Sequence, residues 1–459
     1  MDRSLRARVP TSPSGMSRPL QLIAAAALVC CVFGAMSGDA TATGAAAMPA
    51  PHPAGAMSTT DPVVEWNQIF NDTVLATVPA PNSLVTSRSA ALLAAAVFDA
   101  VNGVDREYRS LLVTERAPAR TSAPAAAIQA AYAMLVRLYP AQAAVLLARR
   151  NASVEALVAS DPPDEAHLID RGLSWGQAVA DTIWTARQSD GFTPTMAPFL
   201  GSPTLGHWRP TPPQNLSGSG PQFATMTPWV LSRPSQFRPA PPPALASQAY
   251  ATDFNETRLW GAAANSLRSQ EQSDIALFWS GNGTLFWTRV AVQLAAASRQ
   301  SLVGNAHLFA VLHLAMADAS LATWDAKYRY VFWRPVTAIT SPLDDGNPET
   351  SADPLWTPFL TTSAHPEYPS GHSNLAGAAA AVMGALFGDD VTFDATSETK
   401  VGMTRSFVGF APAVAEMADA RVFGGMHFRT ACVTGSALGR TVAEYVMENA
   451  MLPRGRGRD

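Results

Sequence analysis

Apolar residues recur along this chain at intervals of three and four, the spacing that places them on one face of a helix. The pattern begins near Val63 and returns in successive segments separated by prolines and glycines. From Val63 onward, no stretch alternates convincingly between apolar and polar residues over several strands. The sequence therefore predicts an all-α fold, with some irregular or short strand pieces in a proline-rich segment.

Alanine-rich segments make up much of the predicted helices, and this small side chain lets neighbouring helices pack closely. The pattern predicts one helical bundle in residues 59–191 and a second in residues 244–449. We predict helices near residues 63–74, 83–102, 125–138, 141–157, 169–187 and 305–328, a helix that starts at 370–372 and ends at Phe387, and a last helix from His427 to Val446.

Between the two bundles, residues 192–243 combine many prolines with large aromatic residues such as Trp208, Phe223 and Trp229. A disordered linker rarely carries so many large aromatics, because they need burial. We therefore predict a long ordered excursion that wraps over the bundle and is a candidate wall of a cleft.

The first 58 residues are typical of a secretory signal followed by a low-complexity tail. Several arginines precede an apolar stretch from Leu20 to Met36, and Ala40-Thr41-Ala42 is a candidate cleavage site. The first interpretation is export to a secreted or periplasmic location, and the second is a retained N-terminal anchor. We expect no membrane span in the mature chain, and a basic tail at residues 450–459.

Charge and cysteine content narrow the function classes. A net charge of -4 gives no support for a nucleic-acid partner. Of the 3 cysteines, only Cys432 follows the signal, so no intrachain disulfide can form in the mature chain and stability must come from packing. Lys327 and Lys400 are the only lysines, which makes the role of each worth examining.

Ser370, Gly371 and His372 follow two prolines and lie where an alanine-rich helix is predicted to begin. The first amides of a helix lack intrahelical partners, and the helix dipole is positive there, so this place suits an oxyanion. The three residues offer a hydroxyl, an approachable amide and an imidazole. An ordinary turn and helix cap is an equally good reading of the motif alone.

Two further groups supply charge. Large apolar residues lie between Lys327 and Arg334 in the sequence, which indicates that both side chains are buried. Buried cations need an anion. Arg421 precedes a pair of glycines and His427, which is predicted to begin the last helix. A solvated helix end and a satisfied core histidine are the ordinary alternatives. Taken together, three cations, two neutral donors and two imidazoles predict a site for a tetrahedral oxyanion or its metal-oxide mimic.

In order and spacing, Lys-x6-Arg-Pro, Pro-Ser-Gly-His and Arg-x5-His resemble the three-part signature of the vanadium-dependent haloperoxidases and the related type 2 phosphatidic acid phosphatases. The likeness to the bacterial secreted haloperoxidases extends over about Val63 to Met447. It implies a helical-bundle fold of the vanadium haloperoxidase and acid phosphatase type. It also implies small-molecule partners, namely hydrogen peroxide, a halide and an organic acceptor.

The resemblance implies a vanadate cofactor, with His427 as the metal ligand, His372 as the acid–base group and Lys327 polarising bound peroxide. In the phosphatase relatives the two histidines are nucleophile and general acid, and phosphate takes the place of vanadate. His365 stands where bromoperoxidases of the family carry histidine, which favours bromide. The vanadate oxygens are held by the positions of Lys327, Arg334, Ser370, Gly371 and Arg421.

Two residues depart from the family pattern. Ala420 stands where serine is frequent, and Ala431 stands where an aspartate often follows the ligand histidine by four residues. A carboxylate there would orient the imidazole, so its absence puts metal affinity in doubt unless another acid replaces it. The sequence thus favours a vanadate-dependent haloperoxidase, with a phosphomonoesterase and a non-catalytic secreted oxyanion-binding protein as alternatives.

Overall fold

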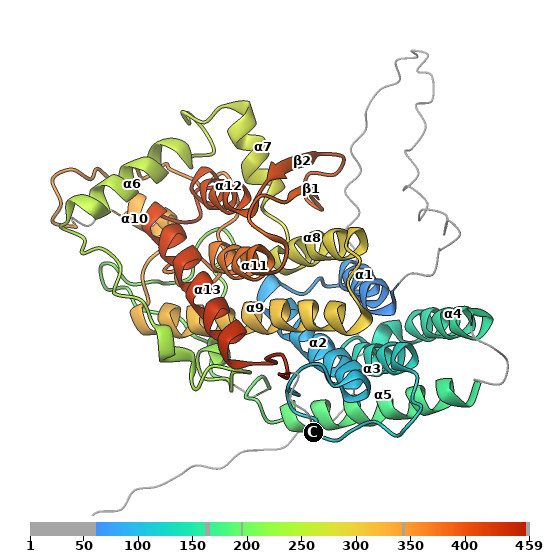
Figure 1. The fold of residues 1–459 in the computed structure, drawn as a ribbon. Coiled ribbons are helices and arrows are strands. Elements are labelled where there is room, and N and C mark those ends of the chain that lie inside the picture. The colour runs from blue at the N-terminus through green and yellow to red at the C-terminus, as the bar shows by residue number, and fades with distance from the viewer. Residues whose placement is uncertain (1–60, 161–165, 194–195, 342–344, 456–459) are drawn as a thin grey trace, which may run out of the picture. The chain divides into compact units, whose positions relative to one another are not determined.

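The structure is a computed structural model that describes residues 61–160, 166–193, 196–341 and 345–455. Residues 57–459 form one compact unit. The predicted signal and the whole low-complexity tail lie outside the described residues. The unit is mainly helical, which confirms the predicted fold class (Figure 1).

The N-terminal helices match the predicted pattern closely. Side-chain caps set their starts: Asp61, Asn82 and Ser122 each accept hydrogen bonds from amides of the first helical turn. These helices are α1 (Pro62–Leu75), α2 (Ser83–Asp105), α3 (Ala123–Leu138), α4 (Ala143–Ser160) and α5 (Ala166–Arg187), with a 3-10 turn η1 (Pro140–Gln142) before α4.

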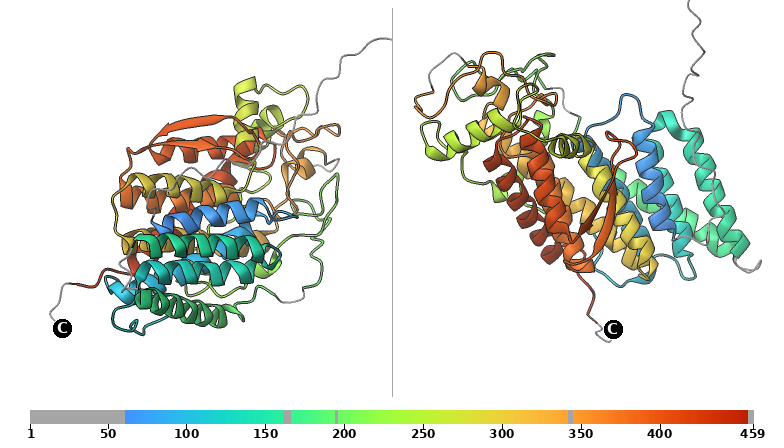
Figure 2. Two further views of the ribbon diagram at one scale, coloured as in Figure 1. Left: turned by 90° about the vertical axis from the view of Figure 1, so that its right-hand side faces the viewer. Right: turned by 90° about the horizontal axis from the view of Figure 1, so that it is seen from above.

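The C-terminal helices pack around α9, whose alanines and leucines are buried along nearly its whole length. Helix α2 packs on one side of α9, and α11 and α13 pack on another, so both predicted bundles share one core (Figure 2). The predicted boundaries at residues 191 and 243 stay predictions. The C-terminal helices are α6 (Gln248–Trp260), α7 (Gln270–Phe278), α8 (Gly283–Ala297), α9 (Leu302–Tyr330), α10 (Pro335–Ile339), α11 (Gly371–Phe387), α12 (Phe410–Phe423) and α13 (Arg429–Asn449).

The proline-rich excursion is fixed to α9 rather than loosely attached. The buried Asp318 carboxylate accepts hydrogen bonds from the amides of Trp229, Val230 and Leu231, at 2.7 to 2.9 Å. Trp208 is fully buried, and its amide donates to the carbonyl oxygen of Val331, directly after α9. The excursion therefore supports the end of α9 that carries Lys327. Its 3-10 turns are η3 (Pro221–Ala224) and η4 (Pro234–Phe237).

The short strand pieces predicted in the proline-rich segment are present as isolated bridges, of Phe199 with Gly218 and of His207 with Phe332. The described sheet is an antiparallel hairpin of β1 (Thr392–Thr396) and β2 (Thr404–Val408), outside the excursion. The two strands have few apolar residues, because only one face of the hairpin is covered. On that face Phe393 and Phe407 pair across the strands. Five-residue strands give too short an alternation to stand out in the sequence.

Helices α2 and α9 have the length and apolar composition of a membrane span, as does the bent pair Ala123–Leu138 with Pro140–Ser160. In the apolar windows of α2 and α9, however, 89% and 83% of the residues are buried inside the protein. Their apolar side chains are thus covered by neighbouring helices. The expectation that the mature chain has no membrane span stays a prediction.

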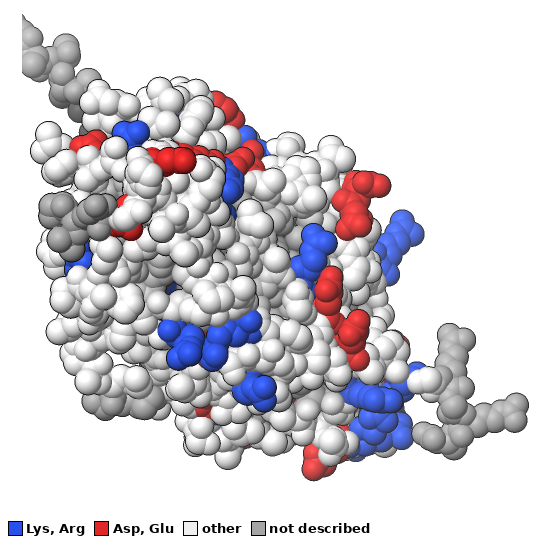
Figure 3. All heavy atoms as spheres, turned by 90° about the vertical axis from the view of Figure 1, so that its left-hand side faces the viewer, with Lys and Arg blue, Asp and Glu red and all other residues white. Residues whose placement is uncertain are grey.

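One face of the unit is shown in Figure 3, where Lys and Arg lie in small separate groups among uncharged side chains. On this face the described residues form no continuous basic stripe of the kind that follows a nucleic-acid backbone.

Candidate active site

The first motif segment starts in the last turn of α9. Lys327 is fully buried, and its Nζ donates to the carbonyl oxygens of Pro366 and Glu367, both at 2.8 Å. An ammonium group has three donors, so one remains for a bound anion. Arg334 is the N-cap residue of α10 and is also fully buried.

Arg334 joins the first segment to both of the others. Its Nε donates to the carbonyl oxygen of His365 at 2.8 Å, and its Nη1 donates to the carbonyl oxygen of Met426 at 2.8 Å. The same Nη1 lies 3.2 Å from His427 Nε2. The Arg334 guanidinium therefore contacts both the loop before α11, at His365, and the loop before α13, at Met426 and His427.

The second segment ends where α11 begins, as the prolines and glycine predict. Ser370 is the N-cap residue, and Gly371 and His372 are the first residues of the helix. Ser370 Oγ accepts hydrogen bonds from the amide and the hydroxyl of Ser373, so its own proton is available to an anion. The first amides of α11 likewise lack helical acceptors.

The third segment differs from the prediction in one respect. Arg421 lies in the last turn of α12, but α13 begins at Arg429, so His427 precedes the helix instead of starting it. The loop is tight because Gly425 adopts a positive φ of 70°. A Cβ there would lie 2.5 Å from the Gly261 carbonyl oxygen, so only glycine fits.

Sequence reasoning did not identify Glu367 as a site residue. It is fully buried, and its Oε1 lies 2.8 Å from His427 Nδ1. Glu367 therefore supplies the carboxylate that Ala431 lacks. The only sequence signal was its place inside the second motif segment, five residues before His372.

A turn between α7 and α8 also lines the site. The carbonyl oxygen of Gly281 lies 3.0 Å from His372 Nε2, and that of Trp279 accepts from Arg421 Nη1 at 3.4 Å. The contact of this turn with the site was not predicted from the sequence. Because a carbonyl oxygen only accepts, Nε2 of His372 carries a proton and Nδ1 is the free base.

Arg421 stands out because it lacks an anionic partner. Its side chain is 1% exposed, its Nη2 contacts Met426 Sδ at 2.8 Å, and its Nε has no partner among the described residues. Burial lowers the pKa of Arg421 to about 10. A bound oxyanion would accept a hydrogen bond from this unpaired N–H, which none of the described neighbouring groups does.

Electrostatics also favour neutral imidazoles in the site. Burial, reinforced by Arg421, lowers the pKa of His372 to about 3. Burial, followed by Arg334 and Lys327, lowers the pKa of His427 well below its ordinary value. Near pH 7 both rings are therefore neutral and each keeps one lone pair, as a metal ligand or a base requires.

His365 is not a surface histidine. Its ring centroid lies 5.1 Å from that of Trp324, and its Nδ1 lies 2.9 Å from Arg334 Nη2. It thus faces the guanidinium that also contacts His427. The structure brings together the whole predicted set: Lys327, Arg334, His365, Ser370, Gly371, His372, Arg421 and His427.

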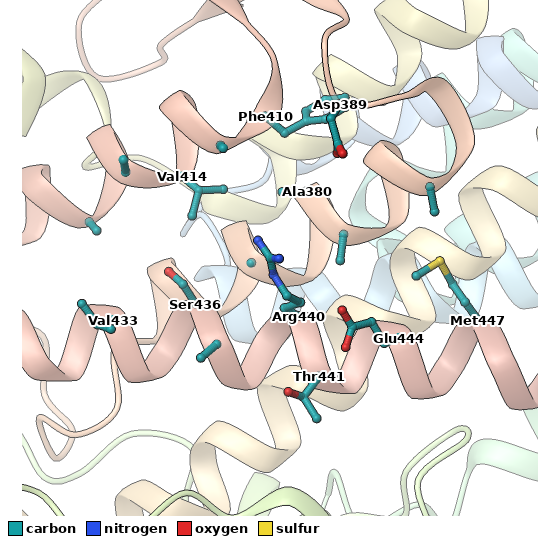
Figure 4. A pocket seen from close by; sticks show the side chains of 17 residues that line it. Ala380, Asp389, Phe410, Val414, Val433, Ser436, Arg440, Thr441, Glu444 and Met447 are labelled. Carbon is teal, nitrogen blue, oxygen red and sulfur yellow. The ribbon is translucent and has the colours of Figure 1, made fainter.

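A separate groove of about 760 Å³ lies between α11, α12 and α13. Figure 4 shows that it is walled by small apolar side chains, with Arg440 and Glu444 on α13. None of the predicted site residues lines it. It is therefore a feature of the outer side of α11, whose N-terminus belongs to the oxyanion site.

Comparison with known proteins matches this geometry. A family model for the second helical-bundle domain of vanadium chloroperoxidases (VCPO) matches residues 307–454, which contain all three motif segments. Vanadium chloroperoxidase from Curvularia inaequalis is 30% identical over 173 residues. That match covers 30% of this chain and 28% of the fungal protein, so it spans little more than a quarter of that relative.

Solved structures match over more of the chain. The structure described as the first bacterial vanadium-dependent iodoperoxidase is 26% identical, with a TM-score of 0.73, covering 88% of this chain and all of its own. A holo-type bacterial vanadium-dependent chloroperoxidase is 20% identical, with a TM-score of 0.64, covering 80% of this chain and 92% of its own. The second likeness concerns the fold alone.

Proposed function

This chain belongs to the vanadium haloperoxidase family, and we propose that it is a vanadate-dependent enzyme that oxidises halide with hydrogen peroxide. The observation that carries the proposal is the enclosed group of Lys327, Arg334 and Arg421 beside His427. One carboxylate, Glu367, contacts this group through His427, and burial raises its pKa to about 8. The excess positive charge suits a multiply charged oxyanion such as vanadate.

The donor set fits vanadate in chemistry as well as charge. Lys327, Arg334 and Arg421 offer N–H donors to its oxygens, and His427 offers an Nε2 lone pair to the metal. When bound, vanadate supplies a Lewis-acid centre that polarises peroxide without changing oxidation state. His372 Nδ1, a free base, accepts a proton from the incoming hydrogen peroxide.

The enclosure of the site determines how strongly these charges act. Lys327, Arg334 and Ser370 are fully buried, and His427 is 2% exposed. In such a water-poor site, fixed donors stabilise developing negative charge more strongly than they would in water. Lys327, already fixed by two carbonyl oxygens, keeps its third donor directed without reorganisation.

Parallel assays test the proposal on one preparation of apo protein. With added vanadate, peroxide and bromide or iodide, we expect halogenation of a phenol dye that rises from a negligible background. Phosphatase turnover of an aryl phosphate is measured beside it, with and without vanadate. A folded protein that binds vanadate and halogenates with none of iodide, bromide or chloride would contradict the proposal.

For the halide, we propose bromide over chloride, on the basis of His365. Its ring is held between Trp324 and Arg334, so it places a polar edge beside the guanidinium. H365F is expected to lower the bromide-to-chloride rate ratio about tenfold, a difference of about 1.4 kcal/mol, because the ring edge that favours bromide is lost. The exposed His207 gives the control, H207F. An unchanged ratio in H365F would count against this role.

A phosphomonoesterase is the second candidate, because Glu367 holds His427 with its proton on Nδ1 and with an Nε2 lone pair, which faces Arg334 and would attack phosphorus. His372, whose ring is neutral, would have to take up a proton on Nδ1 before it protonates the leaving oxygen. Phosphatase turnover without any vanadate-dependent halogenation would favour this reading. The non-catalytic alternative rested on Ala431, and Glu367 removes that support. We also propose export of the chain by the N-terminal signal.

A further inference from the structure

Glu367 joins the segment around Lys327 to the segment around His427. Its Oε1 accepts hydrogen bonds from His427 Nδ1 at 2.8 Å and from the Phe428 amide at 3.0 Å. Its own amide donates to the Phe332 carbonyl oxygen at 2.9 Å, and its carbonyl oxygen accepts from Lys327 Nζ at 2.8 Å. The backbone and the carboxylate of Glu367 are therefore held by the first and third motif segments respectively.

The contacts on both ring nitrogens assign the tautomer of His427. A guanidinium has donors and no acceptor, so Arg334 Nη1, at 3.2 Å, requires a lone pair on His427 Nε2. In a neutral imidazole the other nitrogen then carries the proton. His427 Nδ1–H accordingly donates to Glu367 Oε1. Without Glu367, the Nδ1 proton would lose its acceptor, and the long contact with Arg334 alone would favour this tautomer.

We propose that Glu367 is the residue that positions His427, taking the place of the aspartate frequent at position 431. This inference rests on the proposed function, because it treats His427 as the ligand of bound vanadate. Ala431 is 1% exposed and lies in the first turn of α13, where its methyl group can orient no ring. The orienting carboxylate has thus moved from the helix after His427 to the loop before α11.

The role of Glu367 is that of an acceptor oxygen. Oε1 receives both N–H groups, while Oε2 has no partner among the described residues. A proton on the carboxyl would therefore sit on Oε2 and leave both hydrogen bonds intact. A glutamine can keep the same acceptor, since the Phe428 amide selects the side-chain oxygen. A leucine of similar size cannot.

The pair E367L and E367Q separates positioning from bulk. Vanadate affinity is measured by isothermal titration without peroxide or halide, with inorganic phosphate as a second probe. We expect E367L to bind vanadate about 10- to 100-fold more weakly than E367Q. In apo protein labelled with 15N-histidine, the His427 signal should report a proton on Nδ1 in the wild type and E367Q, and a tautomer mixture in E367L.

Asp253 supplies the matched control, because it is another buried carboxylate, on α6, and lies against the start of α13. It accepts from the Thr430 amide at 3.1 Å and does not contact His427. D253N should leave the His427 tautomer and vanadate affinity unchanged. Equal affinities for E367L and E367Q, or an unchanged tautomer in E367L, would overturn the inference.

The two proposals can fail separately. If the wild type binds vanadate with His427 protonated on Nδ1 but oxidises no halide, the proposed function fails and the role of Glu367 stands. If halide oxidation proceeds and E367L binds vanadate like E367Q, the role of Glu367 fails and the proposed function stands. Should E367L not fold, E367Q decides alone, because a proton mainly on Nε2 of its His427 would refute the assignment.

Discussion

Replacement of His427 by alanine is expected to remove vanadate-dependent halide oxidation, lowering turnover by at least about 10³-fold, or about 4 kcal/mol. His427 is the only imidazole in the set whose Nε2 faces Arg334 while its Nδ1 is held by a carboxylate. H427A should therefore lose vanadate binding as well as turnover, which titration and the dye assay measure together. H372A should lose turnover but still bind vanadate, because His372 acts on the proton.

Another buried histidine provides the control for H427A. His313 on α9 is fully buried, packs against Phe309 and Phe70, and has no hydrogen-bond partner among the described residues. H313L removes an equally buried imidazole from the core and should leave turnover within a few-fold of the wild type, since no site residue contacts it. Vanadate binding by H427A at wild-type affinity would show that His427 is not the ligand.

The helices could be predicted because each carries its information locally. Apolar spacing, prolines and side-chain caps placed α2 and α9 to within a few residues, and the bend before Ser370 placed the start of α11. The predicted start of α13 at His427 is two residues early, because Gly424 and Gly425 are typical of a tight loop that ends directly before a helix. The loop continues to Phe428, which is the N-cap residue of α13, and the Phe428 amide donates to the Glu367 carboxylate.

The site could be predicted as far as its charges and imidazoles, since these residue types imply chemistry at fixed spacing. The turn at Trp279 and Gly281 could not, because it contributes main-chain carbonyl oxygens that any residue possesses. Glu367 could not be assigned either. Its partner, His427, lies 60 residues away in the sequence, and only the packing of α11 against α13 brings them together.

Arg421 should stabilise the anion complex at the expense of the anion-free protein. In the apo protein we expect R421L to be more stable than the wild type by about 1–3 kcal/mol, the cost of an unsatisfied buried polar group. With vanadate or phosphate at about 1,000 times its dissociation constant, the wild type gains about 4.1 kcal/mol. R421L should gain little, so the order of stability reverses, which thermal melting with and without anion measures.

Arg429 makes this prediction specific to an unpaired cation. It lies only eight residues from Arg421 but forms ion pairs with Glu256 and Asp419. R429L should therefore lower stability by up to about 1 kcal/mol, and it should keep the full anion-induced increase in melting temperature. If R421L responded to anion like R429L, the guanidinium of Arg421 would not be part of the anion site. The excess positive charge of the site would then have to be matched by a group other than a bound oxyanion.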